Sequence, residues 1–125
     1  MPLSFSERRK ILKKANYLEL RPTRIYSEEV TKDNLVTVLI PKFRNSFAVK
    51  FVMPKLKAQV FKLQLDELGS ATWLLINGKN NVAYIIKKLD EKFGEKIKPA
   101  QERVIKFLTQ LYEQRLITFE EIKGA

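Results

Sequence analysis

The chain has 125 residues, enough for one domain with a sizeable core, and 45% of them are hydrophobic, which argues against disorder. It contains no cysteine and no histidine, so disulfides and thiolate or imidazole metal sites are excluded, and the commonest general base is missing. A net charge of +10 suggests nucleic-acid binding, because clustered Lys and Arg release counterions from phosphate. The surplus is uneven, however: residues 1–64 hold 14 Lys/Arg against 5 Asp/Glu, and residues 65–125 hold 10 against 9.

Residues 1–16 have the composition of a basic N-terminal extension, and we expect residues 17–125 to form the domain. The extension lacks the continuous apolar run of a signal peptide, and no run in the sequence approaches the roughly 20 residues of a membrane span. The sequence therefore predicts a cytoplasmic protein that does not enter a membrane.

Turn chemistry and β-branched residues predict the first strands. TKDN at 31–34 is a turn sequence, and the run LVTVLIP that follows it ends at Pro41, so we expect a β-hairpin whose first strand lies within 23–30. The next segment, KFRNSFAVKFVMPKLK at 42–57, is a basic insertion. Its phenylalanines, Phe43, Phe47 and Phe51, recur about every four residues, which favours a short amphipathic helix.

The segment QVFKLQL at 59–65 is the clearest strand of the chain because its apolar residues alternate. Phe61, Leu63 and Leu65 are predicted to share the face toward the core. Val60, Lys62 and Gln64 are predicted to face away from it.

Three helices follow, and each has recognisable ends. The first is predicted to begin at the cap Asp66 and to end at Asn77-Gly78. The second starts after Asn80 or Asn81 and stops at Gly94. The third follows Pro99, runs to about Arg115, and precedes a short strand in LITFE.

The third helix is apolar over an unusually broad surface. Its main stripe contains Val104, Phe107, Leu108 and Leu111, and Ile105 and Tyr112 widen that stripe beyond what one-sided packing needs. Two explanations remain open: a binding partner covers the second face, or the helix is wedged between two core elements.

Other conspicuous side chains have structural explanations. Trp73 stands in the middle of an apolar helix, as expected of a core residue. Asp66 and Glu67 are adjacent carboxylates that helix capping explains better than acid–base chemistry does.

A small antiparallel sheet of about three strands followed by three capped helices is an α+β arrangement of the winged helix-turn-helix kind. The stretch LDELGSATWLLINGKNNVAYIIKKLDEKFG at 65–94 resembles the PqqD family, and the resemblance extends more loosely through the third helix and upstream to Arg21-Pro22. It is carried by Leu65, Asp66, Ala71, Trp73, Leu75, Gly78, Val82, Ile85, Leu89 and Phe93.

The resemblance implies a non-catalytic, cofactor-free module that binds the leader of a ribosomally made precursor peptide. Such a module presents the leader to a modifying enzyme, of the radical S-adenosylmethionine type in pyrroloquinoline quinone synthesis. The leader adds as an extra strand to the sheet, in a groove walled by the third helix. In this chain the peptide-binding residues would be Val60, Lys62, Gln64, Ile105, Leu108 and Tyr112. The extension 1–16 and the insertion 42–57 depart from the family pattern, and the insertion would block or replace this site if it folded over the sheet edge.

Two other classes of function are weaker alternatives. A winged-helix nucleic-acid binder is favoured by the total charge, but residues 99–115 hold only one more basic than acidic side chain. An enzyme is disfavoured because carboxylates, Lys and Tyr form no convergent cluster in the sequence. The sequence does not indicate an oligomeric state.

Overall fold

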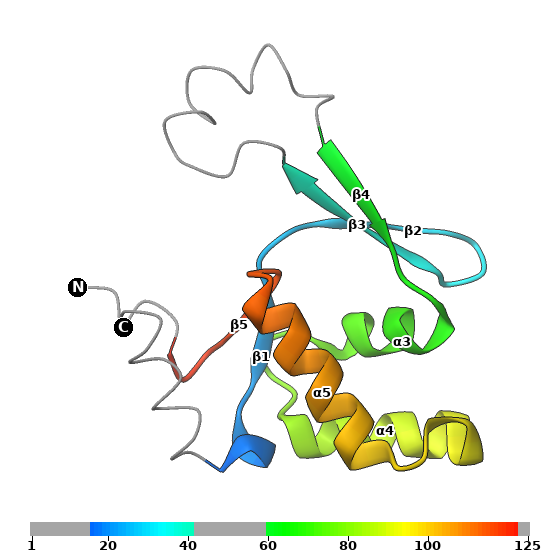
Figure 1. Ribbon diagram of the computed structural model, residues 1–125, viewed down its shortest axis with the longest axis vertical. Coiled ribbons are helices and arrows are strands. Elements are labelled where there is room, and N and C mark those ends of the chain that lie inside the picture. The colour runs from blue at the N-terminus through cyan, green and yellow to red at the C-terminus, as the bar shows by residue number, and fades with distance from the viewer. Residues whose placement is uncertain (1–15, 42–59, 123–125) are drawn as a thin grey trace.

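A computed structural model of the protein describes residues 16–41 and 60–122 (Figure 1). Apart from Asn16, the predicted basic extension 1–16 and the predicted insertion 42–57 lie outside these residues. The predicted α+β class, with a small antiparallel sheet followed by three helices, is confirmed. The elements in chain order are η1 (Tyr17–Glu19), β1 (Pro22–Arg24), β2 (Glu28–Val30), β3 (Val36–Pro41), β4 (Val60–Gln64), α3 (Glu67–Leu75), α4 (Val82–Phe93), η2 (Gly94–Ile97), α5 (Ala100–Glu113) and β5 (Ile117–Phe119).

The larger sheet has three antiparallel strands in the order β2-β3-β4. The predicted hairpin joins β2 to β3, and the Thr31 hydroxyl accepts hydrogen bonds from the backbone N–H groups of Asp33 (3.3 Å) and Leu35 (3.1 Å). Asn34 has a φ of 63°, a left-handed conformation that asparagine tolerates better than most residues. Among the described strands, β4 is paired on one side only, so it forms an edge of this sheet.

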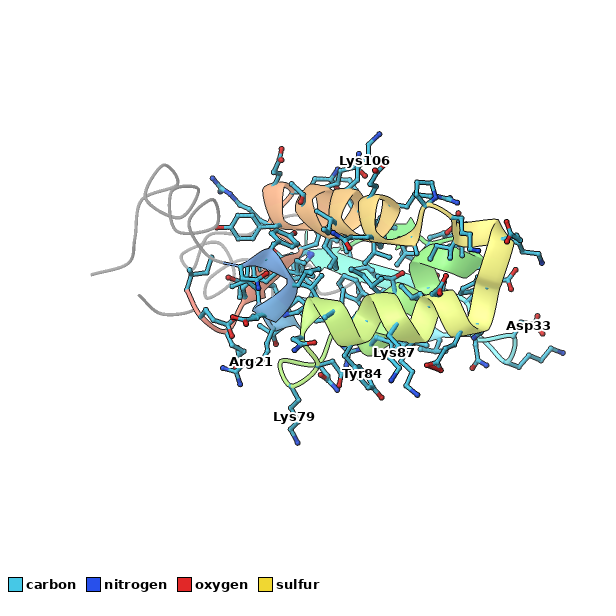
Figure 2. The ribbon with its side chains drawn as sticks, turned by 90° about the horizontal axis from the view of Figure 1, so that it is seen from below. Arg21, Asp33, Lys79, Tyr84, Lys87 and Lys106 are labelled. Carbon is cyan, nitrogen blue, oxygen red and sulfur yellow. The ribbon has the colours of Figure 1, made fainter. Side chains whose placement is uncertain are left out.

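The three helices begin and end close to the predicted residues. A side-chain oxygen of Asp66 accepts from Gly69 N (2.7 Å) at the start of α3, and Asn81 accepts from Tyr84 N (2.8 Å) at the start of α4. Gly94, with a φ of 54°, ends α4. Seen from below, α4 and α5 lie side by side, and Lys106 points outward from α5 (Figure 2).

A second, two-stranded sheet pairs β1 with β5, which brings the two ends of the described chain together. Beside this pairing, Arg21 donates to Glu121 through both its backbone N–H and its Nε, each at 2.9 Å. The sequence predicts β5 but not its pairing with β1, because three residues per strand carry almost no periodic signal.

The core lies between the larger sheet and the helices, which are packed on one side of it (Figure 1). Trp73 is fully buried, as predicted, and its Nε1 donates to Glu28 Oε1 (2.9 Å). The same oxygen accepts from Arg24 (2.9 Å), so one carboxylate joins β1, β2 and α3.

A buried serine closes the junction between the sheet and α3. Ser70 Oγ accepts from Val36 N (2.8 Å) and donates to Leu65 O (3.2 Å). The hydroxyl therefore lies where a direct ladder bond between those two residues would otherwise form, and it fixes the end of β4 against β3 and α3.

Candidate functional site

The open edge of β4 is defined by the direction of its backbone groups. Leu65 N donates to Val36 O (2.9 Å), which places the backbone groups of Leu65 toward β3. Because this direction alternates along an antiparallel strand, the N–H and C=O groups of Leu63 also point toward β3, whereas those of Lys62 and Gln64 point to the open edge. Lys62 and Gln64 are consecutive outward-pointing residues of the edge strand, and an added strand forms its backbone hydrogen bonds with residues of this kind.

The side chains of β4 follow the predicted alternation, with one correction. Leu63 and Leu65 are half-buried against the core. Phe61 pairs with Ile40 and lies on the same face, but it is 56% exposed. The prediction that Phe61 joins the core is wrong: Ile40, on the central strand β3, is buried in the core, whereas Phe61 stands on the edge strand β4 and does not belong to the core cluster.

The residues predicted to face away from the core sit on the outer face or at its margin. Lys62 and Gln64 are exposed, and Val60 is half-buried. Lys62 Nζ lies 3.7 Å from Glu29 Oε1, so this exposed pair spans the sheet from β4 to β2. Such a pair contributes only about 0–1 kcal/mol to stability.

The residues predicted to form the wall on α5 lie in or against the core. Leu108 is fully buried, Tyr112 is 7% exposed, and Ile105 is half-buried against the core. Tyr112 packs on Phe119 of β5 with ring centroids 5.5 Å apart. These side chains offer a partner little surface, and the broad apolar stripe has the second explanation given above: the helix is wedged between core elements.

The flank of α5 that includes Ile105 and Tyr112 contacts η1 and β5, and we call it the closed flank. Thr109, on the same flank, exchanges a hydrogen bond of 3.1 Å with the hydroxyl of Tyr17 in η1. Burial raises the pKa of the Tyr17 hydroxyl, and the hydrogen bond with Thr109 opposes that rise in part.

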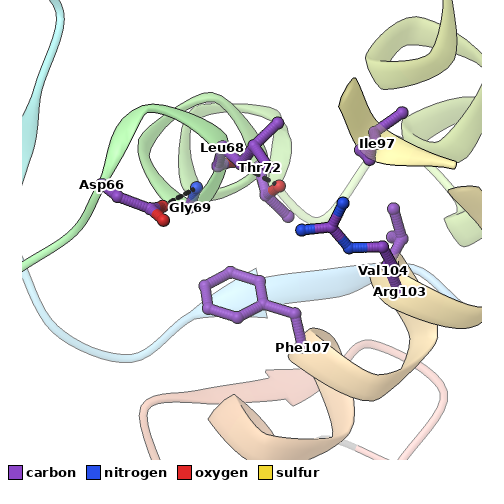
Figure 3. A pocket seen from close by; sticks show the side chains of 8 residues that line it. All are labelled: Asp66, Leu68, Gly69, Thr72, Ile97, Arg103, Val104 and Phe107. Carbon is purple, nitrogen blue, oxygen red and sulfur yellow. Dashed lines mark hydrogen bonds between the residues drawn. The ribbon is translucent and has the colours of Figure 1, made fainter. Parts of the chain in front are cut away.

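The opposite flank of α5, which includes Arg103 and Phe107, borders a pocket and is here called the open flank. The pocket has a volume of about 160 Å³ and lies between the first turns of α3, η2 and the first half of α5 (Figure 3). It is lined by Asp66, Leu68, Gly69, Thr72, Ile97, Arg103, Val104 and Phe107.

Most polar groups of the pocket are already engaged. Asp66 caps α3, and the Thr72 hydroxyl donates to Leu68 O (2.8 Å). One N–H of the Arg103 guanidinium donates to Lys96 O (2.7 Å), which fixes the guanidinium at the mouth of the pocket (Figure 3).

Gly69 connects this pocket to the end of β4. A β-carbon at Gly69 would lie 3.4 Å from both Leu65 Cβ and Phe107 Cζ. The glycine therefore lets the Phe107 ring approach the first turn of α3, next to the residue that follows β4. The sequence predicts Phe107 as part of the core stripe and gives Arg103 no site, and only the tertiary structure brings the two together at one pocket.

The described residues contain little else that points to chemistry. No group of three or more acidic side chains within 16–41 and 60–122 is arranged to hold a metal ion. Within the same residues, no helix has both the length and the apolar character needed to cross a membrane.

Comparison with known proteins identifies the region that contains the β4 edge and the pocket. The family model for coenzyme PQQ synthesis protein D (PqqD) matches residues 59–117, which include β4, the three helices and the first residue of β5. No curated protein and no solved structure matches the chain. This match confirms the resemblance to the PqqD family that residues 65–94 predicted.

Proposed function

We propose that this protein is a non-catalytic peptide-binding module that captures the leader of a ribosomally made precursor peptide and presents it to a modifying enzyme. The family match gives the accessory, peptide-binding role at a coarse level. The enzyme would be of the radical S-adenosylmethionine type that the family resemblance implies.

The observation that carries the proposal is the open edge of β4 beside the open flank of α5. Lys62 and Gln64 direct their backbone N–H and C=O groups to this edge, so an extended peptide can pair there without disturbing the β3–β4 ladder. Main-chain pairing would supply affinity, and the adjoining pocket would supply selectivity. Phe107 and Arg103 replace Ile105, Leu108 and Tyr112 as the proposed residues on α5.

Charge argues against the alternative of a nucleic-acid binder. The described residues hold thirteen Lys/Arg and thirteen Asp/Glu, so the surplus of the chain lies entirely outside them. Helix α5 itself has two basic and two acidic side chains. A helix that enters a nucleic-acid groove normally has a clear basic excess.

Substitution of one outward-facing residue tests strand addition. Gln64→Pro removes a backbone donor on the open edge and no bond to β3, whereas Gln64→Ala keeps that donor and removes only the side chain. Peptides selected from a displayed random library on the full chain serve as probes. Proline should weaken their binding about tenfold, the value of one net hydrogen bond of roughly 1.4 kcal/mol, and alanine should change it little.

The same peptides, added to isotopically labelled protein, should shift the amide resonances of residues 60–66. Circular dichroism must first show that both variants remain folded. Equal losses for alanine and proline, or resonance shifts confined to residues 42–57, would contradict binding at the β4 edge.

A further inference from the structure

The pocket beside α5 has the dimensions of one side chain. Its volume of about 160 Å³ is close to the ~150 Å³ of a protein cavity that admits a benzene ring, and below the ~300 Å³ from which sites for whole small molecules begin. Apart from the capping Asp66 and the bonded Thr72, the interior is apolar, with Leu68, Ile97 and Val104 among its walls. A single large aliphatic or aromatic side chain fits this space.

Arg103 adds a charge at the mouth of that apolar space. Only one of the five N–H groups of its guanidinium is used by Lys96 O. Within residues 16–41 and 60–122, no carboxylate lies within ion-pair distance of it. The remaining donors are in the planar arrangement that binds a carboxylate through two hydrogen bonds.

The pocket also lies close to the end of β4. Leu65 follows β4 directly, and its side chain and the Phe107 ring both approach Gly69 at the pocket floor. A peptide that pairs with Lys62 and Gln64 and continues past the end of β4 would come next to this pocket.

We infer that the pocket selects peptides in which one large apolar residue is accompanied by a neighbouring carboxylate. The apolar side chain occupies the space walled by Phe107, and the carboxylate pairs with Arg103. The inference rests on the proposed strand addition and specifies the ligand class. The whole chain, at +10, attracts acidic ligands as well.

Charge reversal with a matched control tests the carboxylate. A displayed random peptide library is selected against the full chain, against Arg103→Glu and against Lys106→Glu, which makes the same charge change on the outward face of α5 (Figure 2). The parent and Lys106→Glu should enrich Asp or Glu close to a large apolar residue. Arg103→Glu should lose the acidic preference and enrich Lys or Arg at that position.

Synthetic versions of an enriched peptide separate the two sources of a carboxylate. Replacing its Glu by Gln should weaken binding to the parent roughly tenfold to hundredfold, as expected for a hydrogen bond to a charged group. If amidation of the C-terminus has this effect instead, the pocket binds a peptide end, and the assignment of an internal acidic residue is overturned.

Substitution of Phe107, which forms one wall of the pocket, tests the preference for a large apolar residue. Phe107→Ala should abolish the preference for large apolar residues while Gln64→Pro still weakens whatever peptides remain. If Arg103→Glu and Phe107→Ala enrich the same motifs as the parent, the pocket inference is wrong and strand addition stands. If the parent enriches no peptides, both proposals fall.

Discussion

The two flanks of α5 differ in what covers them. On the closed flank, Tyr112 is buried against β5 and Thr109 is hydrogen-bonded to Tyr17 of η1. On the open flank, Phe107 is half-buried and Arg103 is exposed at the mouth of a pocket. One flank of the helix therefore completes the core, and the other borders a pocket. The apolar character of the residues alone does not distinguish the two flanks.

The largest expected effect is a difference in the stability that the protein loses when a ring on each flank is removed. Tyr112→Ala should lower the free energy of unfolding by roughly 3–5 kcal/mol, because it empties a buried aromatic site. Phe107→Ala should cost about 1–2 kcal/mol, because that ring is only half-buried. Urea unfolding followed by circular dichroism measures both, and equal losses would show that the flanks are packed alike.

Substitution of Ser70, at the junction next to the open flank, should lower stability by an intermediate amount. Ser70→Ala should cost roughly 1–3 kcal/mol, since Val36 N and Leu65 O lose their buried hydroxyl partner. Hydrogen exchange should then accelerate at Val36. Ser27→Ala, at an exposed serine whose backbone carbonyl accepts from Leu39 N, should change stability by less than about 0.5 kcal/mol. Unchanged exchange at Val36 would mean that water replaces the hydroxyl without cost.

The smallest expected effect concerns the closed flank and depends on pH. Tyr17→Phe removes the hydrogen bond to Thr109 and should cost about 1 kcal/mol near neutral pH. The folded protein raises the pKa of Tyr17 above its ordinary value of 10.0, so the contribution of the neutral hydroxyl is complete below pH 10 and is lost as pH rises through the raised pKa.

Denaturation at several alkaline pH values checks the sign of this dependence. Stability of the parent should fall more steeply above pH 10 than stability of Tyr17→Phe. Tyr84→Phe, at an exposed tyrosine of α4, is the control and should follow the parent. Parallel curves for Tyr17→Phe and the parent would place Tyr17 in contact with solvent.

Much of the fold was predictable because its signals are local. The turn at Thr31, the caps at Asp66 and Asn81 and the stop at Gly94 each depend on a few neighbouring residues, and all four lie where the sequence indicates. The β4 strand was equally clear from its alternation.

The open flank was not predictable because it is created by tertiary contacts. Pairing of β1 with β5 and the position of η1 decide which side of α5 is covered, and neither leaves a periodic pattern in the sequence. The sequence therefore left open whether core elements cover Ile105 and Tyr112, and it placed Phe107, which borders the pocket, in the core stripe.

The β4 edge also constrains how two copies of the protein can meet. Backbone groups that could pair with a peptide strand could equally pair with β4 of a second molecule. In an antiparallel pairing centred on this strand, Lys62 is the middle residue of Val60–Gln64 and would stand directly opposite Lys62 of the other copy. Like charges in that position repel, so Lys62 disfavours self-association while it leaves the edge open to a strand of opposite charge.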